Sequence, residues 1–407
     1  MKPVHSMLDF DEARRRLLHA ARAPTATQHL ALLQAAGLTL ANPVVSPINV
    51  PGFDNSAMDG YALAVGDFSA LPEVFPVGQR IAAGQTGMPL QVNTAARIFT
   101  GAPTPPGCNA IVPQEHTSEQ PGGVQLNRPV QPGQHIRHLG EDIAAGATVL
   151  TSGQRLGPQH LAMAASVGVA TLTVFQRLQV GVLFTGDELT EPGQPLAPGA
   201  IYNSNRYAIV AMLHQLGCVV QDYGIVRDSA VATREALARA AAENDVIITC
   251  GGVSVGEEDH VKAAVQVLGK LDLWQISMKP GKPLAYGTIG QADFIGLPGN
   301  PVSAFVTFML LARPFLQKRM GMPDPGLQTL TATAGFDWPR PDKRREFLRV
   351  RFDPSAPGNG MLQRWGNQGS GVMSSIAWAD GLVDIAPATI IRQGDQVRYI
   401  PLSSLLN

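Results

Sequence analysis

The chain is short of cysteine, of excess charge and of long apolar runs, and each shortage excludes a class of protein. Its 407 residues include three cysteines, Cys108, Cys218 and Cys250, which lie far apart without a CxxC pair. A disulfide framework or a structural zinc site is therefore not expected, and a reducing cytoplasm is the expected location. The net charge of −1 provides no basic surplus for nucleic acid or a membrane surface.

From the apolar residues we expect neither a membrane span nor an export signal. The longest apolar stretch, residues 304–312, is too short to cross a bilayer and contains Thr307. The first residues lack the apolar core of a signal peptide. The sequence also has no Ser-His-Asp triad, no His-rich metal spacing and no Walker loop. A composition of 45% hydrophobic and 15% charged residues suits well-packed domains. The length predicts about two to four of them.

The spacing of apolar residues predicts four domains. Helices are expected over residues 9–21, 28–40 and 151–169, which form an N-terminal helical domain from residues 1–50 and 146–177. The intervening residues 51–145 alternate short strands with Pro and Gly pairs, and we interpret them as a β-rich insertion. Strand-like alternation in residues 326–407 predicts a separate small β-barrel or sandwich.

Residues 178–325 alternate strands with helices, which predicts a mostly parallel sheet in a three-layer α/β/α domain. Ligands in such sheets bind outside the carboxyl ends of the strands. Three unusual loops fall at such ends, namely residues 185–188, 251–256 and 298–301.

The glycine run after the apolar strand 245–248 is the most informative of these loops. Gly251, Gly252 and Gly256 open a turn in which backbone N–H groups attract anions. Three acids follow, Glu257, Glu258 and Asp259, which suits a divalent cation between carboxylates and a phosphate. The alternative is a tight turn without a ligand, with Asp259 capping the next helix.

Two further segments indicate anion binding. Pro298, Asn300 and Pro301 mark a helix start whose N–H groups face the same sheet edge. Lys279 and Lys282 lie in a proline-stiffened loop of a chain that has only seven lysines. The alternatives are an ordinary helix start and a solvated charged loop.

The other polar clusters fit either a site or local structure. Asp187 and Glu188 suit a ribose hydroxyl or a metal, or else cap a turn. Asp228 is either a ligand or a helix cap. The polar segment 53–61, Arg137 with residues 141–142, and the arginines of 344–349 with residues 368–370 are candidates for the same reason. An Asx-turn network or outward-facing arginines of a strand would explain them equally.

Taken together, these motifs resemble the MoeA-type molybdopterin molybdenumtransferases, which are related to the E domain of gephyrin. The resemblance extends over nearly the whole chain in the family's order, through residues 54–62, 100–103, 140–143, 185–189, 204–207, 251–256, 279–283, 297–301 and 368–370. It implies a MogA-like central domain, an elongated homodimer, and a cleft between the α/β domain of one subunit and the β domains of the other. It also implies transfer of molybdenum from molybdate to adenylylated molybdopterin, with release of AMP and participation of magnesium.

The resemblance implies a role for each matching residue. As catalytic residues it suggests Asp59, Asp142, Glu188, Asp259 and Lys279, with Glu188 and Asp259 also as metal ligands. As substrate-binding residues it suggests Thr100, Arg137, Asp228, Gly251, Gly252, Ser254, Lys282, Pro298, Asn300, Pro301, Arg349 and Ser370. Expected partners are an adenylyltransferase that supplies the substrate and proteins that accept the cofactor.

Three positions depart from the family's pattern. Gln275 stands where a basic residue is frequent, Glu257 where Asp is common, and Ser229 where a second acid often follows Asp228. Two other functions remain open from the sequence alone. One is a molybdopterin adenylyltransferase or nucleotide-pyrophosphate hydrolase, for which the α/β domain would suffice. The other is a non-catalytic scaffold of the gephyrin type. Tungstate is an alternative to molybdate because the two oxyanions are nearly equal in size and charge.

Overall fold

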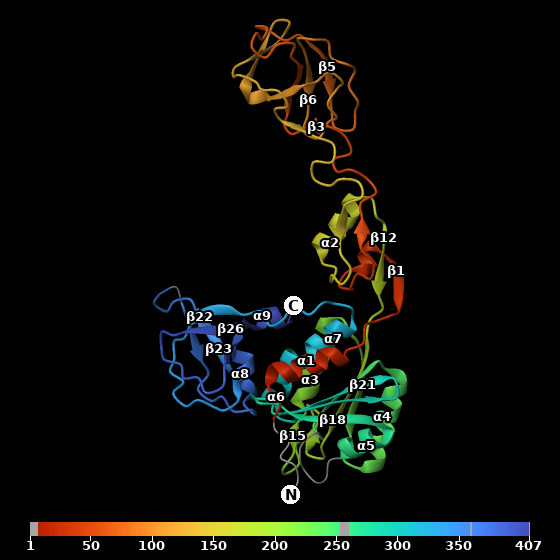
Figure 1. Ribbon diagram of the computed structural model, residues 1–407, viewed down its shortest axis with the longest axis vertical. Coiled ribbons are helices and arrows are strands. Elements are labelled where there is room, and N and C mark those ends of the chain that lie inside the picture. The colour runs from red at the N-terminus through yellow and green to blue at the C-terminus, as the bar shows by residue number, and fades with distance from the viewer. Residues whose placement is uncertain (1–6, 253–259, 359, 407) are drawn as a thin grey trace. The chain divides into compact units, whose positions relative to one another are not determined.

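The computed structural model describes residues 7–252, 260–358 and 360–406 (Figure 1). The chain divides into two compact units. The first contains residues 1–28, 37–39 and 174–407, and the second contains residues 29–36 and 40–173. Each unit has its own buried core and is described by itself. The four domain boundaries expected from the sequence remain predictions.

The centre of the first unit is a sheet whose described strands follow the order β16-β13-β17-β21-β20-β18. The first four run parallel, β20 is antiparallel to β21, and β18 is antiparallel to β20. The strands are β13 (Gln179–Thr185), β16 (Val219–Val226), β17 (Val246–Cys250), β18 (Gly269–Gln275), β20 (Pro283–Ile289) and β21 (Ala292–Leu297). Strands β17 and β21 are buried along their whole length, as expected for a parallel sheet covered on both faces.

Helices cover both faces of this sheet. One core contains residues of α1, α3 and the helix after β21, and the opposite core contains residues of α4 and α5. The helices are α1 (Phe10–Ala20), α3 (Ser204–Leu216), α4 (Ala230–Glu243), α5 (His260–Leu268), α6 (Pro301–Thr307) and α7 (Arg313–Arg319). The predicted three-layer α/β/α fold is therefore confirmed.

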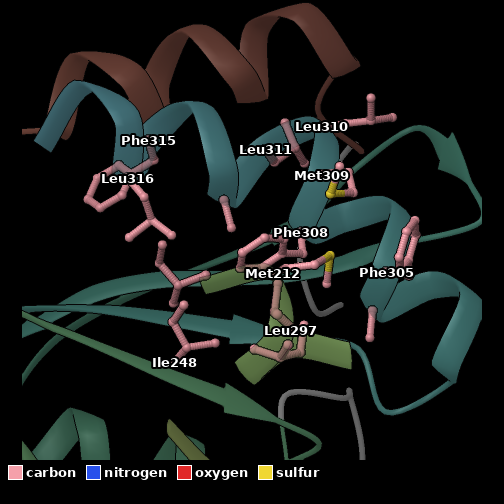
Figure 2. Packing of buried hydrophobic residues seen from close by; sticks show 14 of the residues in the cluster. Met212, Ile248, Leu297, Phe305, Phe308, Met309, Leu310, Leu311, Phe315 and Leu316 are labelled. Carbon is pink, nitrogen blue, oxygen red and sulfur yellow. The ribbon is translucent and has the colours of Figure 1, made fainter. Parts of the chain in front are cut away.

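The helix expected after residue 301 contains a wider turn. Between α6 and α7 lies the π-helical segment η3 (Phe308–Ala312), where the N–H of Arg313 donates to the carbonyl of Phe308. Pro314 lacks an N–H, so the α-helical bond to Leu310 is absent and the backbone adopts the wider turn. Figure 2 shows Phe308, Phe315 and Leu316 between this helix and the sheet residues Ile248 and Leu297. This packing fixes η3 and α7 against the sheet.

The last part of the first unit is the small β-barrel predicted from the sequence. Its described strands run in the order β24-β23-β25-β26-β22, and a bridge between Ala334 and Leu362 joins the two ends. The strands are β22 (Leu330–Thr333), β23 (Arg345–Asp353), β24 (Met361–Arg364), β25 (Gly381–Ile385) and β26 (Gln396–Pro401), with α8 (Met373–Trp378) and α9 (Leu402–Leu406). The short strand β19 (Met278–Lys279) pairs with β23, which brings the lysine loop to the barrel.

The second unit has the β character predicted for residues 51–145. A four-stranded sheet in the order β5-β6-β4-β7 carries a separate apolar core on each face. Its described strands and their neighbours are β4 (Gly60–Ala64), β5 (Val77–Ile81), β6 (Thr94–Ile98), β7 (Ala110–Pro113), β8 (Thr117–Gln120), β9 (Gly123–Leu126), β3 (Asn55–Ser56) and β10 (Ile136–Arg137). Beside them lie β2 (Val44–Val45), β11 (Thr148–Leu150), α2 (Pro158–Ser166) and the 3₁₀ turn η2 (Gln114–His116).

The predicted helix over residues 28–40 is wrong. The segment forms β1 (Thr27–Ala31), followed by a short 3₁₀ turn, η1 (Leu32–Ala35), and β1 pairs with β12 (Thr171–Phe175). Burial along β1 alternates with a period of two, and Leu33, which would lie on the apolar stripe of a helix, is 86% exposed. Pairing with a strand distant in sequence therefore outweighs the local helix-like pattern.

Candidate functional site

The candidate site lies at the carboxyl ends of β13, β17 and β21, as the loop positions predict. These strands are parallel neighbours, so Thr185, Gly251 and Pro298 meet at one edge. There they line a cavity of about 690 Å³. Lys279, Lys282, Arg344, Glu188 and residues 368–370 also line it. Loops of the sheet and of the β-barrel thus line one cavity, whose wall carries two lysines, an arginine and a glutamate.

The glycine turn after β17 can be formed only by residues without a side chain. Gly251 has φ +96°, and a Cβ there would lie 2.9 Å from the carbonyl oxygen of Thr185. Gly252 has φ +64°, and its Cβ would lie 2.5 Å from a methyl of Val261. Both features exclude ordinary side chains, so the backbone closes tightly over β13. Ser254 and Asp259 lie outside the described residues.

Asn205, at the start of α3, ties two of the loops together. Its Nδ2 donates to the carbonyl of Gly299 at 2.7 Å and to Sγ of Cys250 at 3.0 Å. The thiol of Cys250 in turn donates to the carbonyl of Pro298 at 3.1 Å. Burial raises the pKa of this thiol to about 12, so Cys250 remains protonated and is not a nucleophile.

The segment around Pro301 begins a helix, as predicted. Asn300 is the N-cap of α6 and Pro301 its first residue, although within the described structure the Asn300 side chain makes no capping bond. The N–H of Val302 donates to the carbonyl of Ser370 at 3.0 Å. The barrel loop that carries Ser370 is thereby fixed to the first turn of α6, and both line the cavity.

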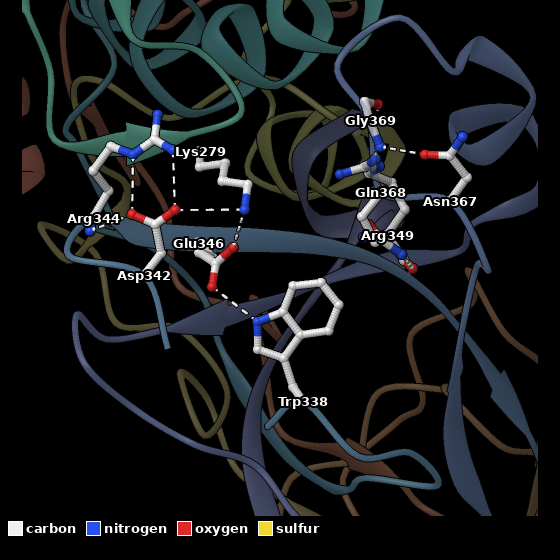
Figure 3. A network of polar contacts seen from close by, with 9 residues as sticks. All are labelled: Lys279, Trp338, Asp342, Arg344, Glu346, Arg349, Asn367, Gln368 and Gly369. Atoms are coloured by element: carbon white, nitrogen blue, oxygen red, sulfur yellow. Dashed lines mark hydrogen bonds and ion pairs between the residues drawn. The ribbon is translucent and has the colours of Figure 1, made fainter. Parts of the chain in front are cut away.

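The two lysines of the loop differ in their surroundings. Gly281, between them, has φ +106°, and a Cβ there would lie 2.4 Å from Oγ1 of Thr307, so the loop is pressed onto α6. Lys282 is exposed, and no carboxylate of the described residues lies within 4.0 Å of its ammonium group. Lys279 is paired, at 2.9 Å with Glu346 and at 3.5 Å with Asp342 (Figure 3).

The two arginines named from the sequence occupy different positions. Arg344 lines the cavity and donates two hydrogen bonds to Asp342, which holds the pKa of that carboxyl well below its usual value. Arg349 is 1% exposed and lies beneath the loop 368–370. Its guanidinium donates to Ser375 and to the carbonyl of Gly369, each at 3.0 Å, and burial lowers its pKa to about 10. Arg349 therefore supports the loop and does not line the cavity.

A smaller cavity of about 280 Å³ adjoins the first and is acidic. Glu188, Asp228, Gly252 and His260 line it, and Glu188 lines both cavities. The N–H of Asp228 donates to Asp187 at 3.2 Å. Ser229, not Asp228, caps α4 through its hydroxyl oxygen, so the reading of Asp228 as a helix cap is wrong. Asp228 thus lines the cavity without capping the helix.

The candidates of the second unit lie on loops of its sheet. Thr100 donates to one carboxylate oxygen of Asp59 through its N–H and its hydroxyl, each at 2.8 Å. Arg137 is an exposed residue of β10, paired in register with Asn55. Asp142 is exposed, and its N–H donates to the carbonyl of Val50.

Replacing Thr100 with Val tests the Asp59–Thr100 pair. The pKa of Asp59 is lowered most by the N–H of Thr100, next by the Thr100 hydroxyl, and less by the charge of Arg97, because each of them favours the ionised form. Any stability that this pair contributes to the fold is present at pH values above the ordinary carboxyl pKa. It is lost as the pH falls through the lowered pKa of Asp59 in the folded protein. Thr100→Val keeps the N–H and removes the hydroxyl, so we expect the pKa of Asp59 to rise part of the way to its ordinary value. A carbon NMR titration of labelled Asp measures this, and an unchanged midpoint contradicts it.

Several lining residues were not identified from the sequence. Tyr202 is the last residue of β15 (Ile201–Tyr202), which pairs with β14 (Leu189–Thr190). Asn203 is the N-cap of α3, and Asn205 lies in the first turn of that helix. Ser303 lies in the first turn of α6. The match over residues 204–207 was the only signal for Asn205, and the sequence contained none for Ser303.

Comparisons with known families cover most of the chain. Residues 8–168 match "MoeA N-terminal region (domain I and II)", residues 181–318 match "Probable molybdopterin binding domain", and residues 331–402 match "MoeA C-terminal region (domain IV)". Among the described residues, helices are too short or too polar to cross a membrane.

Individual relatives are similar over nearly their whole length. The chain is 37% identical to molybdopterin molybdenumtransferase of Haemophilus influenzae, over 98% of this chain and 100% of the relative. It is 40% identical to molybdopterin molybdenumtransferase 2 of Mycobacterium tuberculosis, over 91% and 94%. The crystal structure of a molybdopterin biosynthesis MoeA protein from Pyrococcus horikoshii superposes with a TM-score of 0.84 at 27% identity, over 97% of this chain and 99% of that one.

Proposed function

Because this chain belongs to the MoeA family of molybdopterin molybdenumtransferases, it inserts molybdenum in molybdenum cofactor biosynthesis, and we propose that the cavity of the first unit is where this occurs. The proposed substrates are molybdate and adenylyl-molybdopterin, and AMP leaves when the phosphoanhydride is cleaved. One observation carries the proposal. The glycine turn, the two loop lysines, Arg344 and the 368–370 loop meet around a single cavity large enough for a nucleotide-sized ligand.

The charges of this cavity suit its anionic substrates. The ammonium groups of Lys279 and Lys282 and the guanidinium of Arg344 attract the oxygens of molybdate through charge-assisted hydrogen bonds. Ser370 supplies a hydroxyl and Pro298 to Pro301 supply the start of α6 at the same wall. We assign binding of the substrate phosphates to Gly251, Gly252 and Ser254, which follows them in the sequence. Arg349 contributes by holding Gly369 at the cavity edge.

Magnesium is proposed for the adjoining acidic cavity. Among the described residues, no group of three or more His, Cys, Asp or Glu side chains is placed to hold a metal ion. Glu188 and Asp228 nevertheless line one cavity beside the glycine turn, and Asp259 follows that turn in sequence. Mg²⁺ requires only one or two carboxylates, because water and substrate phosphates complete its shell, so the donor set fits. When bound, the ion would neutralise charge on the departing phosphate.

The remaining assignments rest on the resemblance to the family. We propose a homodimer and assign Asp59, Thr100, Arg137 and Asp142 to the same substrate. We also propose that the protein acts in the cytoplasm, in keeping with its three cysteines, which lie far apart in the sequence. An adenylyltransferase would supply its substrate and cofactor-dependent enzymes would accept its product.

Incubation of the purified protein with adenylyl-molybdopterin, molybdate and Mg²⁺ tests the proposed function. AMP is followed by chromatography, and its release is expected to require molybdate and the divalent cation. Release that proceeds equally without molybdate would instead indicate a nucleotide-pyrophosphate hydrolase. Absence of release under all conditions would favour a non-catalytic scaffold. A parallel reaction with tungstate measures the preference between the two oxyanions.

A further inference from the structure

We propose that Glu346, a barrel residue not named by any of the motifs above, is a positioning residue for Lys279. It holds the ammonium group of Lys279 in one position at the cavity wall. Its negative charge at the same time weakens the attraction of that ammonium group for an anion. This inference rests on the proposed function, in which Lys279 faces an anionic substrate. The evidence is the geometry of the network in Figure 3.

Backbone pairing sets the two residues side by side. Lys279 in β19 is the register partner of Glu346 in the parallel strand β23, and the ladder begins with Met278 opposite Arg345. The ammonium of Lys279 then lies 2.9 Å from a carboxylate oxygen of Glu346. The Lys279 side chain is 41% exposed and that of Glu346 is 2% exposed. The charge of Lys279 therefore reaches the cavity, whereas the group that orients it is buried.

The carboxylate of Glu346 is itself held in place. Its second oxygen accepts a hydrogen bond from the indole Nε1 of Trp338 at 2.8 Å. Trp338 is anchored to Ile391 by backbone hydrogen bonds in both directions. Since each oxygen has a separate partner, the carboxylate cannot rotate without losing one of them. A fixed counter-ion confines the long, flexible lysine side chain to a small region, which keeps the ammonium oriented toward the reacting substrate.

The neighbouring charges make Glu346 the main counter-ion of Lys279. Asp342 is 3.5 Å from the ammonium, but its carboxylate also accepts two hydrogen bonds from the guanidinium of Arg344, at 3.1 and 3.0 Å, and one from the N–H of Arg344 at 3.0 Å. Within the described part of the chain, Lys279 is the only cation within 4.0 Å of Glu346. An incoming anion therefore meets a lysine whose charge is partly compensated, and Lys282 is the uncompensated neighbour.

Replacing Glu346 with Gln separates positioning from simple structural support. Loss of the negative charge should strengthen molybdate binding about tenfold, because Lys279 no longer shares its charge. The kcat should fall about 10- to 100-fold, because the ammonium is less well placed. A merely structural residue would lower affinity and turnover together. Molybdate binding is measured by equilibrium dialysis with molybdate alone, and turnover is measured by AMP release. Glu235→Gln, on the exposed face of α4, serves as the control.

A second variant keeps the test decisive if Glu346→Gln does not fold. Trp338→Phe retains the ring and the Glu346 charge but removes the indole donor, so kcat should fall several-fold with molybdate affinity unchanged. Unchanged affinity in folded Glu346→Gln, or parallel losses of affinity and kcat in either variant, overturns the role of Glu346. Lys279→Ala tests the role of Lys279 in the proposed function separately from the role of Glu346. If it leaves molybdate binding unaltered, the assignment of Lys279 in the proposed function fails, and the present inference fails with it.

Discussion

Lys282→Ala should lower kcat/KM for molybdate about 10- to 100-fold, as expected when one charge-assisted contact to an anion is lost. Lys282 lines the cavity, and its ammonium has no carboxylate partner within 4.0 Å among the described residues. Its charge is thus fully available to the substrate, in contrast to that of Lys279. The loop around it is shaped by Gly281 and by the backbone bond from Ile276 to the carbonyl of Lys282. These features do not depend on the side chain.

Stability and activity should therefore separate in this variant. An exposed lysine without a partner contributes little to folding, so the free energy of unfolding should change by less than about 0.5 kcal/mol. Lys270→Ala is the matched control. Lys270 is exposed on the same sheet, and it lies at the other end of β18 from Gln275, which pairs with Pro283 beside Lys282. It should leave AMP release unchanged. Equal activity of Lys282→Ala and Lys270→Ala would show that the first lysine does not contact the substrate.

Asp293→Ala should lower the free energy of unfolding of the first unit by about 3–5 kcal/mol, because it breaks a buried ionic network. Asp293 is fully buried at the start of β21. Its carboxylate lies 2.9 Å from Arg319 and 3.2 Å from Arg22, and it accepts a hydrogen bond from Tyr286 at 3.1 Å. Burial and the adjacent carboxylate raise the pKa of Tyr286 above its usual value.

The cost arises from the groups that remain after the substitution. Arg319, with 10% of its side chain exposed, would be left without its main counter-ion, and the Tyr286 hydroxyl would lose its acceptor. Urea unfolding followed by tryptophan fluorescence measures the effect in the first unit, since all four tryptophans lie in residues 274–378. Asp272→Ala, an exposed aspartate of β18, serves as the control. A loss below about 1 kcal/mol would mean that Arg319 finds another partner or is hydrated.

Local sequence signals correctly placed the elements of the α/β domain and the site loops. Strands β13, β17 and β21 consist mainly of apolar residues, and the glycines and prolines that follow them interrupt the pattern at the strand ends. The helix predicted over residues 28–40 was wrong because the same apolar residues fit a strand once a distant partner, β12, is available. A pattern read along the chain does not contain that partner.

The sequence predicted which loops form the site, but it did not predict which of their side chains face the cavity. Gly251, Lys279, Lys282, Pro298 and Ser370 line one cavity as expected, and Gly252 lines the adjoining one. Arg349, by contrast, lies beneath the loop 368–370, and Ser229 takes the capping role considered for Asp228. Each of these outcomes depends on which face of a strand or loop a side chain occupies. Such a choice follows from register and packing against other elements.

The sequence by itself determined the alternation of strands and helices, the loops that carry the anion-binding groups, and the family, because these are properties of residue type and order along the chain. Only the tertiary structure decided that, among the described residues, Lys279 has a carboxylate partner and Lys282 has none, since the counter-ion Glu346 lies 67 positions from Lys279 and reaches it through the β19–β23 ladder. The strength of a charge in a site depends on its neighbours in space, and long-range strand pairing selects those neighbours.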